Sequence, residues 1–126
     1  MSFRTDRARV AGLGVARDGV GHWWAQRVTA VALVPLAVLF VIPFARALGA
    51  GREAVLATYA HPFNAIVAML FIGTAFYHLK LGLQVIIEDY VHAKAPRAAA
   101  LVANALGAWL FGLTGVFAVA RIAIGQ

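Results

Sequence analysis

Three long apolar segments limit what this chain can fold into. Residues 28–45 carry no charge, and residues 63–87 and 98–120 are also predominantly apolar. The hydrocarbon core of a bilayer is about 30 Å thick, which a helix of about 20 apolar residues can cross. The whole chain is 63% hydrophobic with a mean hydropathy of +0.83. These features predict an all-α integral membrane protein, with a polar segment over residues 1–27 and one membrane domain of three transmembrane helices over residues 28–126.

The connecting segments refine this prediction. Pro35 lies inside the first span and is expected to kink it, because proline removes one helical hydrogen bond. Residues 46–61 form a short connector, and Pro62 then opens the second helix, where its missing N–H costs nothing. Residues 91–97 form the second loop. Neither connector is long enough to hold a soluble domain.

The basic residues lie mainly outside the apolar segments, which indicates a membrane topology rather than nucleic-acid binding as the origin of the net charge of +6. Cytoplasmic loops of membrane proteins carry an excess of Lys and Arg. The amino-terminal segment and second loop contain Arg4, Arg7, Arg9, Arg17, Arg27, Lys94 and Arg97, whereas the opposite side contains Arg46, Arg52 and Arg121. This predicts a cytoplasmic amino terminus, with no secretory signal, in the inner (cytoplasmic) membrane.

The chain has no cysteine. This excludes disulfides, thiolate-bound iron–sulfur clusters and covalent attachment of a c-type haem. Any redox chemistry at this chain therefore needs a borrowed cofactor.

His78 is the ionisable residue with the strongest functional signal, because it lies near the middle of the second span. Gly82, Val85 and Asp89 project within about 40° of it on a helix. Gly82 would allow a flat macrocycle or another helix to approach closely. The simpler interpretations are a neutral imidazole hydrogen-bonded across helices and ordinary helix packing at the glycine.

Asp89 lies eleven residues after His78, which corresponds to about 16 Å along a helix and places it at the cytoplasmic interface beside Tyr90. An acid and a phenol at this depth could exchange protons between water and a hydrophobic quinone, or could serve only as an interfacial anchor. Lys80 lies on a different face, where snorkelling toward the cytoplasmic headgroups is the preferred interpretation. Arg27 could bind headgroups or a buried anion.

Two segments resemble a known family. The sequence from His78 through Gly82 to Asp89-Tyr90 is similar to the second-helix signature of the small hydrophobic membrane anchor of bacterial succinate dehydrogenase (complex II). The sequence Gln26-Arg27-Val28-Thr29-Ala30 resembles the start of that family's first helix. The three spans and the length also match, so the resemblance covers nearly the whole chain.

The resemblance implies half of a heterodimeric haem-binding helical bundle. In it, His78 is an axial ligand of haem b, with Gly82 beside the cofactor, and the other axial histidine belongs to a second, cytochrome b-type anchor subunit. Tyr90 would hydrogen-bond a ubiquinone carbonyl, with Asp89 in the site or its proton path and Arg27 in the polar surroundings. Electrons would arrive from a flavoprotein subunit and an iron–sulfur subunit. Succinate oxidation and fumarate reduction fit the pattern equally.

Two other functions compete with this hypothesis. A small proton-coupled transporter could use His78, Lys80 and Glu88 as a relay, but the chain lacks repeat symmetry and has no acidic residue at mid-membrane. A purely structural anchor would use His78 only for hydrogen bonding. A haem absorption band that disappears on replacement of His78 would distinguish the anchor that binds haem from the one that does not.

Overall fold

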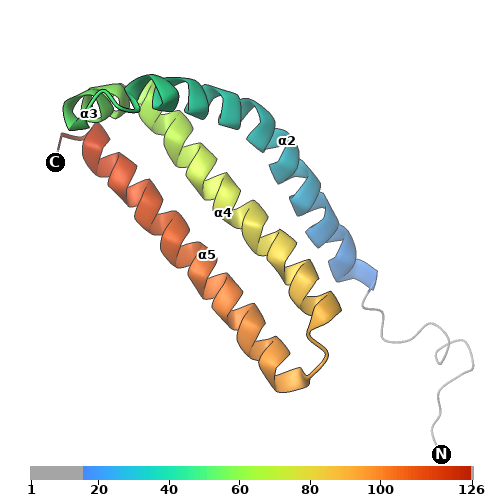
Figure 1. Ribbon diagram of the computed structural model, residues 1–126. Helices are drawn as coiled ribbons and strands as arrows, with labels where there is room; N and C mark the ends of the chain where they lie inside the picture. Colours follow the sequence, from blue (N-terminus) through green and yellow to red (C-terminus); the bar gives the residue numbers. More distant parts are fainter. Residues whose placement is uncertain (1–15, 126) are drawn as a thin grey trace, which may run out of the picture.

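The computed structural model describes residues 16–125, which form four helices and no strand. The helices are α2 (Ala16–Ala47), α3 (Arg52–Ala60), α4 (Pro62–Tyr90) and α5 (Lys94–Ala123). Figure 1 shows α4 and α5 running antiparallel, α2 arching along α4, and the short α3 at the end where α2 stops and α4 starts. The predicted all-α architecture is confirmed.

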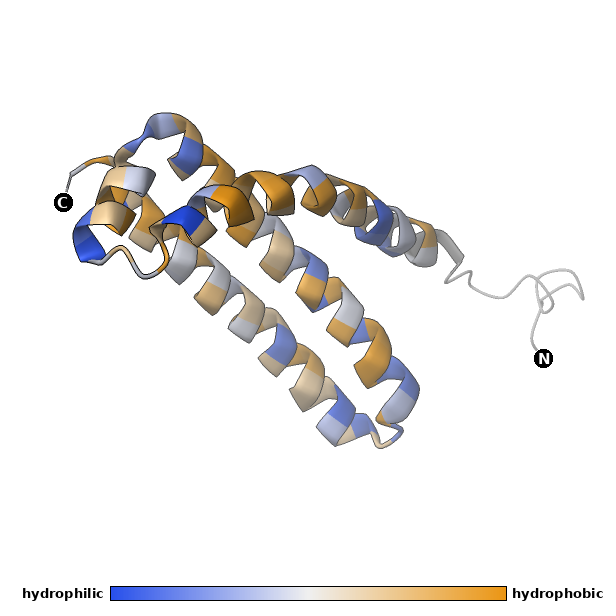
Figure 2. Cartoon of the chain, turned by 45° about the horizontal axis from the view of Figure 1, so that its top comes forward, coloured by the Kyte–Doolittle hydropathy of each residue, from blue (hydrophilic) through white to orange (hydrophobic). Residues whose placement is uncertain are grey.

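The three long helices have the length and composition of membrane spans: Gly19–Ala47 within α2, Pro62–Tyr90 and Lys94–Ala123. A helix of about 29 residues is about 43 Å long, which exceeds the hydrocarbon thickness, so its ends reach the headgroup region. Figure 2 shows hydrophobic residues along the long helices, with hydrophilic residues frequent near their ends. The chain is therefore a multi-pass membrane protein.

The helix boundaries differ from the predicted spans. The first helix begins at Ala16 rather than 28, so it includes the second half of the segment predicted as a polar lead; residues 1–15 lie outside the described part. It continues through Pro35 and Pro43. The loop predicted at 91–97 is shorter, because α5 already begins at Lys94. Hydropathy locates the part of a helix that lies in lipid, whereas the helix itself can extend as a polar turn into the interface.

The connector predicted over residues 46–61 contains α3, a helix of nine residues. Gly49 and Gly51 have positive φ values of 81° and 88°, and this conformation, which glycine adopts without strain, makes the turn before α3. Pro62 opens α4 as predicted.

An aromatic cluster holds α3 against the long helices. The ring of Phe40 in α2 stacks on Phe71 of α4 with centroids 4.6 Å apart and lies 6.2 Å from the ring of Tyr59 in α3. The buried Tyr59 hydroxyl has no hydrogen-bond partner among the described residues, and burial raises the pKa of this phenol. Across the α3–α4 turn, the Asn64 side chain donates to the backbone carbonyl of Thr58 at 3.0 Å.

The α4–α5 contact depends on glycines that let two helices approach. A Cβ atom at Gly115 would lie 2.9 Å from Cγ2 of Ile72, and one at Gly112 would lie 3.2 Å from Cβ of Phe76. Close approach through small residues is a common basis of helix association in membranes. One polar bond crosses the same contact, where Asn104 Nδ2 donates to the carbonyl of Lys80 at 2.9 Å.

Few apolar side chains are buried within the chain itself. The buried ones among the described residues are Ala47, Tyr59, Ala65, Val67, Ala68 and Leu81. Large apolar side chains remain exposed along all three spans, and Val31 of α2, for example, is 73% exposed. Such surfaces are unfavourable in water and suited to lipid or to other apolar helices.

Candidate functional site

The midpoint of α4 is residue 76, so His78 lies two residues past the middle of the helix, and it faces α2. Its Nδ1 atom is 2.8 Å from Oγ1 of Thr29, and its Nε2 atom is 3.3 Å from the amide nitrogen of Gln26. The imidazole is half-buried. Both ring nitrogens therefore contact polar groups of the neighbouring helix.

Gly82 lies one turn after His78 and faces the same part of α2. A Cβ atom at Gly82 would be 3.6 Å from Nε2 of Gln26, which is an ordinary van der Waals distance. The structure thus brings His78 and Gly82 together on the α2-facing side of α4, as the helical spacing predicted. Val85 and Asp89, the other members of the predicted stripe, are exposed.

Three polar residues form a stripe along α2 that the sequence analysis did not recognise. His22, Gln26 and Thr29 are spaced four and three residues apart, so they project within about 60° of one another on a helix. Two polar atoms of this stripe, Nε2 of His22 and Oε1 of Gln26, are buried without a hydrogen-bond partner in the described chain. The spacing was visible in the sequence, but it is meaningful only because α2 begins as early as Ala16.

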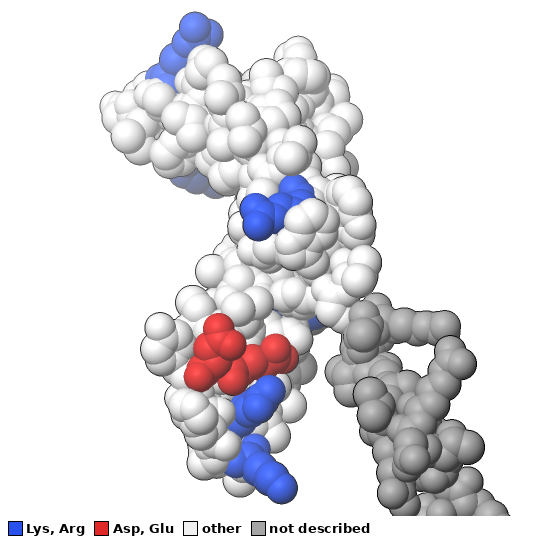
Figure 3. Space-filling model, turned by 90° about the vertical axis from the view of Figure 1, so that its right-hand side faces the viewer, with Lys and Arg blue, Asp and Glu red and all other residues white. Residues whose placement is uncertain are grey.

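Asp89 and Tyr90 occupy the last turn of α4, and both are exposed, Tyr90 at 78%. The neighbouring Glu88 carboxylate accepts a hydrogen bond from the amide of Gln84 at 3.0 Å. Figure 3 shows the acidic side chains on this face gathered near one end of the molecule, with basic side chains beside them. Tyr90 is thus free to contact a group outside the chain.

Arg27 is not brought into a cluster with Asp89 and Tyr90. Its guanidinium lies 5.5 Å from the ring centroid of Trp23, and its side chain is exposed. Its sequence neighbour Gln26 contacts His78, so the Arg27 backbone is level with the His78–Gly82 turn. The Trp23 ring also meets Trp24 edge-on, with centroids 5.2 Å apart.

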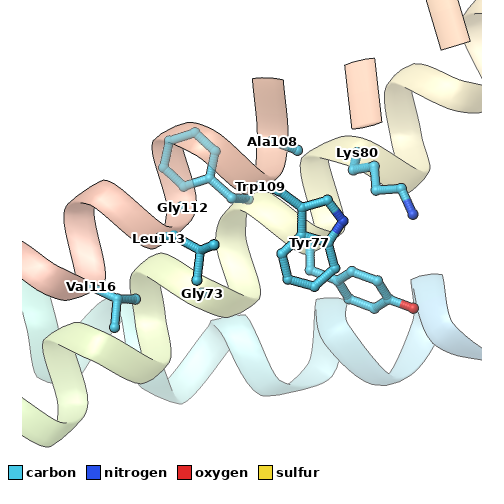
Figure 4. A pocket seen from close by; sticks show the side chains of 9 residues that line it. Gly73, Tyr77, Lys80, Ala108, Trp109, Gly112, Leu113 and Val116 are labelled. Atoms are coloured by element: carbon cyan, nitrogen blue, oxygen red, sulfur yellow. The ribbon is translucent and has the colours of Figure 1, made fainter. Parts of the chain in front are cut away.

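Lys80 lies on the other side of α4, beside a groove between α4 and α5 lined by Gly73, Tyr77, Trp109 and other residues (Figure 4). Its ammonium lies 5.7 Å from the ring centroid of Tyr77, which is three residues earlier in α4. The ammonium therefore lies beside an aromatic ring of the same helix, and the snorkelling of Lys80 toward the headgroups stays a prediction.

His78 can supply one ligand to a metal, since no group of three His, Asp or Glu side chains gathers anywhere in residues 16–125 in a way that could hold an ion. A metal at His78 would need its remaining ligands from a prosthetic group or a partner chain.

Comparison with known proteins identifies the family to which the chain belongs. The family model described as succinate dehydrogenase/fumarate reductase transmembrane subunit matches residues 1–119. A succinate dehydrogenase hydrophobic membrane anchor subunit of Paracoccus denitrificans is 37% identical over 125 residues, covering 99% of this chain and 96% of that protein. The corresponding subunit of Rickettsia bellii is 32% identical over 102 residues, covering 80% and 81%.

A succinate dehydrogenase membrane anchor subunit of Reclinomonas americana is 31% identical over 84 residues, covering 64% of this chain and 70% of that protein. No solved structure matches the chain. The Paracoccus denitrificans match and the family model span nearly the full length, including the α2 stripe and the His78–Tyr90 segment, and they leave the transporter alternative without support. The chain therefore belongs to the succinate dehydrogenase/fumarate reductase transmembrane subunit family, in its group of hydrophobic membrane anchors.

Proposed function

We propose that this membrane anchor supplies His78 as one axial ligand of a haem b shared with a second anchor subunit, and that the end of α4 forms part of a ubiquinone site. The observation that carries the proposal is the position of His78. Its imidazole lies near the middle of a membrane span, with Nδ1 bound to Thr29 at 2.8 Å and Nε2 next to a side-chain amide. Ionisable groups at this depth are costly and are kept mainly for function.

The residues around His78 fit a flat prosthetic group. Gly82 removes a side chain one turn away on the same face. The amide of Gln26 is only 3.3 Å from Nε2, and its buried Oε1 has no partner in the described residues. The contact to Nε2 is the only hydrogen bond of this side-chain amide among the described residues, and a ligand that binds at Nε2 would have to displace the amide.

A haem with two histidine ligands has no open coordination position, so it supplies electron transfer and cross-links the helices that hold it. Imidazole is a suitable axial ligand because its neutral form donates a lone pair to iron. His78 would bind the haem iron, and the polar residues of α2 would hold the His78 imidazole in position. In this proposal the second axial ligand is a histidine of the partner anchor subunit.

Exposure and chemistry support the quinone role of the last turn of α4. The Tyr90 hydroxyl can donate a hydrogen bond to a quinone carbonyl, and the Asp89 carboxylate beside it can exchange protons with water at the interface. Arg27 belongs to the polar surroundings of this region. The Arg27 backbone is level with His78, and its guanidinium reaches the ring of Trp23, which lies one turn closer to the beginning of α2.

The remaining partners follow from what the chain lacks. It contains no cysteine for iron–sulfur clusters, so a flavoprotein subunit and an iron–sulfur subunit must deliver the electrons. We place them on the cytoplasmic side of the inner membrane, at the end of the molecule that holds the start of α2 and the end of α4. The second anchor subunit would cover exposed apolar faces of α2 and α4.

The test is a reduced-minus-oxidised absorption spectrum of the purified complex carrying His78→Ala. We expect the haem band to disappear while the flavoprotein and iron–sulfur subunits still co-purify. The matched control is His92→Ala, which removes an exposed histidine just after α4 and should leave the spectrum unchanged. An unaltered haem band in the His78 variant would refute the proposal.

Tyr90→Phe tests the quinone site separately. Loss of one neutral hydrogen bond costs about 0.5–1.5 kcal/mol, so kcat/KM for quinone reduction should fall roughly 2- to 10-fold while haem content is retained. The control is Tyr77→Phe, which keeps the ring next to Lys80. Unchanged quinone kinetics in the Tyr90 variant would remove this residue from the site.

A further inference from the structure

Thr29 of α2 has a contact that the apolar packing of the helix does not require. Its Oγ1 atom lies 2.8 Å from Nδ1 of His78, although the two residues are 49 positions apart in the chain. We propose that Thr29 is a positioning residue whose hydroxyl accepts the Nδ1–H of His78 and thereby leaves the Nε2 lone pair for iron. This inference rests on the proposed haem ligation by His78.

The direction of the bond follows from the other partner of Thr29. A threonine hydroxyl has one hydrogen, and the backbone carbonyl of Ala25 lies 2.7 Å from Oγ1, with that of Gln26 at 3.1 Å. Carbonyl oxygens can only accept, so the hydroxyl donates to the α2 backbone. Its lone pairs then face Nδ1 of His78, which must carry the hydrogen.

The partner of the second ring nitrogen leads to the same tautomer. The amide nitrogen of Gln26, 3.3 Å from Nε2 of His78, can only donate. Nε2 therefore presents a lone pair toward α2. A ligating histidine generally donates its other N–H to an acceptor that fixes the ring orientation and raises the basicity of the ligand. Thr29 has the position and the free lone pairs to be that acceptor.

The hydrogen bond of Thr29 to its own helix does not explain its position. Thr114 of α5 makes the same local bond, with its hydroxyl donating to the carbonyl of Leu110 at 2.7 Å, but it is exposed and contacts no imidazole. A local bond of this kind therefore forms without any partner on another helix. What distinguishes Thr29 is the second contact, which joins α2 to α4 at His78.

The experiment uses the assembled complex with Thr29→Val, which keeps the shape of the side chain and removes the hydroxyl. We expect haem loss to an external haem acceptor to become about 10- to 100-fold more favourable, as for other partners of metal-bound histidines. The remaining haem should have a higher midpoint potential, because a less basic imidazole stabilises ferric iron less. Thr29→Ser restores the acceptor and should restore both values, and Thr114→Val is the matched control.

The outcomes separate the inference from the function on which it rests. Haem retention and potential equal to wild type in Thr29→Val would overturn the role of Thr29 while leaving His78 as a ligand. A Thr29→Ser variant as impaired as Thr29→Val would also overturn it, because the hydroxyl would then not be the group that matters. Absence of haem from the wild-type complex, with all subunits present, would instead refute the proposed haem ligation.

Discussion

The two sides of α4 are held by different kinds of contact. On the side facing α2, His78 meets Thr29 and Gln26 through polar atoms, and buried polar atoms nearby have no partner among the described residues. On the side facing α5, glycines bring the backbones together, and a Cβ atom at Gly115 would lie only 2.9 Å from Cγ2 of Ile72. One side is therefore organised around a reactive group and the other around close packing.

The difference reflects the energetics of helix association in lipid. Apolar side chains gain little by leaving lipid for another apolar surface, so close van der Waals contact through small residues holds α5 on α4. A polar group in the same environment costs free energy unless it is paired. The unpaired atoms on the α2 side indicate that stability alone does not account for its sequence, which agrees with a site that a cofactor completes.

The largest effect is expected for Gly115→Leu on the packed side. Even a Cβ atom would lie 2.9 Å from Cγ2 of Ile72, so the larger side chain must push α5 away from α4. Overpacking of this kind costs about 1–3 kcal/mol. Thermal unfolding of the detergent-solubilised complex should show a lower midpoint and reduced recovery of all subunits.

Gly107→Leu is the control for this prediction, since a Cβ atom at Gly107 has no neighbour within 4 Å. Replacing Ile72 by Ala together with Gly115→Ala should recover part of the stability that Gly115→Ala alone removes, because the two residues are in contact. A Gly115→Leu complex as stable as wild type would show that packing does not hold this side of α4.

The sequence predicted the coarse parts of this arrangement well. Apolar segments of sufficient length identified the three spans, and the helical spacing of His78 and Gly82 placed both on one face, which the structure confirms. These features are local, because they depend only on residue type and on the pitch of a helix. The same spacing could not indicate which neighbouring helix that face would meet.

Features that depend on contacts between helices were beyond the sequence. Residues 1–27 were predicted to lie outside the helices, so the stripe of His22, Gln26 and Thr29 was not recognised. Helix α3 was not predicted either, because a segment of nine residues that follows two glycines resembles a loop. The contact of Lys80 with the Tyr77 ring was not predicted either, because it depends on the conformations of two long side chains.

A smaller effect is expected for Asn104→Leu, which removes the polar bond on the packed side. Asn104 Nδ2 donates to the Lys80 carbonyl at 2.9 Å. Hydrogen bonds between helices in membranes contribute on average about 0.6 kcal/mol, so the thermal midpoint should fall only slightly. Thr114→Val, which affects no bond between helices, is the control. A fall in the thermal midpoint as large as that caused by Gly115→Leu would mean that polar contacts hold both sides of α4.

No effect on the proposed haem is expected for Lys80→Met, which tests whether the two sides are independent. Lys80 lies about 200° around α4 from His78, and its ammonium contacts Tyr77. Loss of this cation–π contact is worth about 0.5–1 kcal/mol at an exposed site. The proposed haem should keep its absorption spectrum and its midpoint potential, because the charge is on the side of α4 away from the ligand. A shifted potential would show that the charge acts across α4 on His78, and the separation of a reactive side from a packed side would then fail.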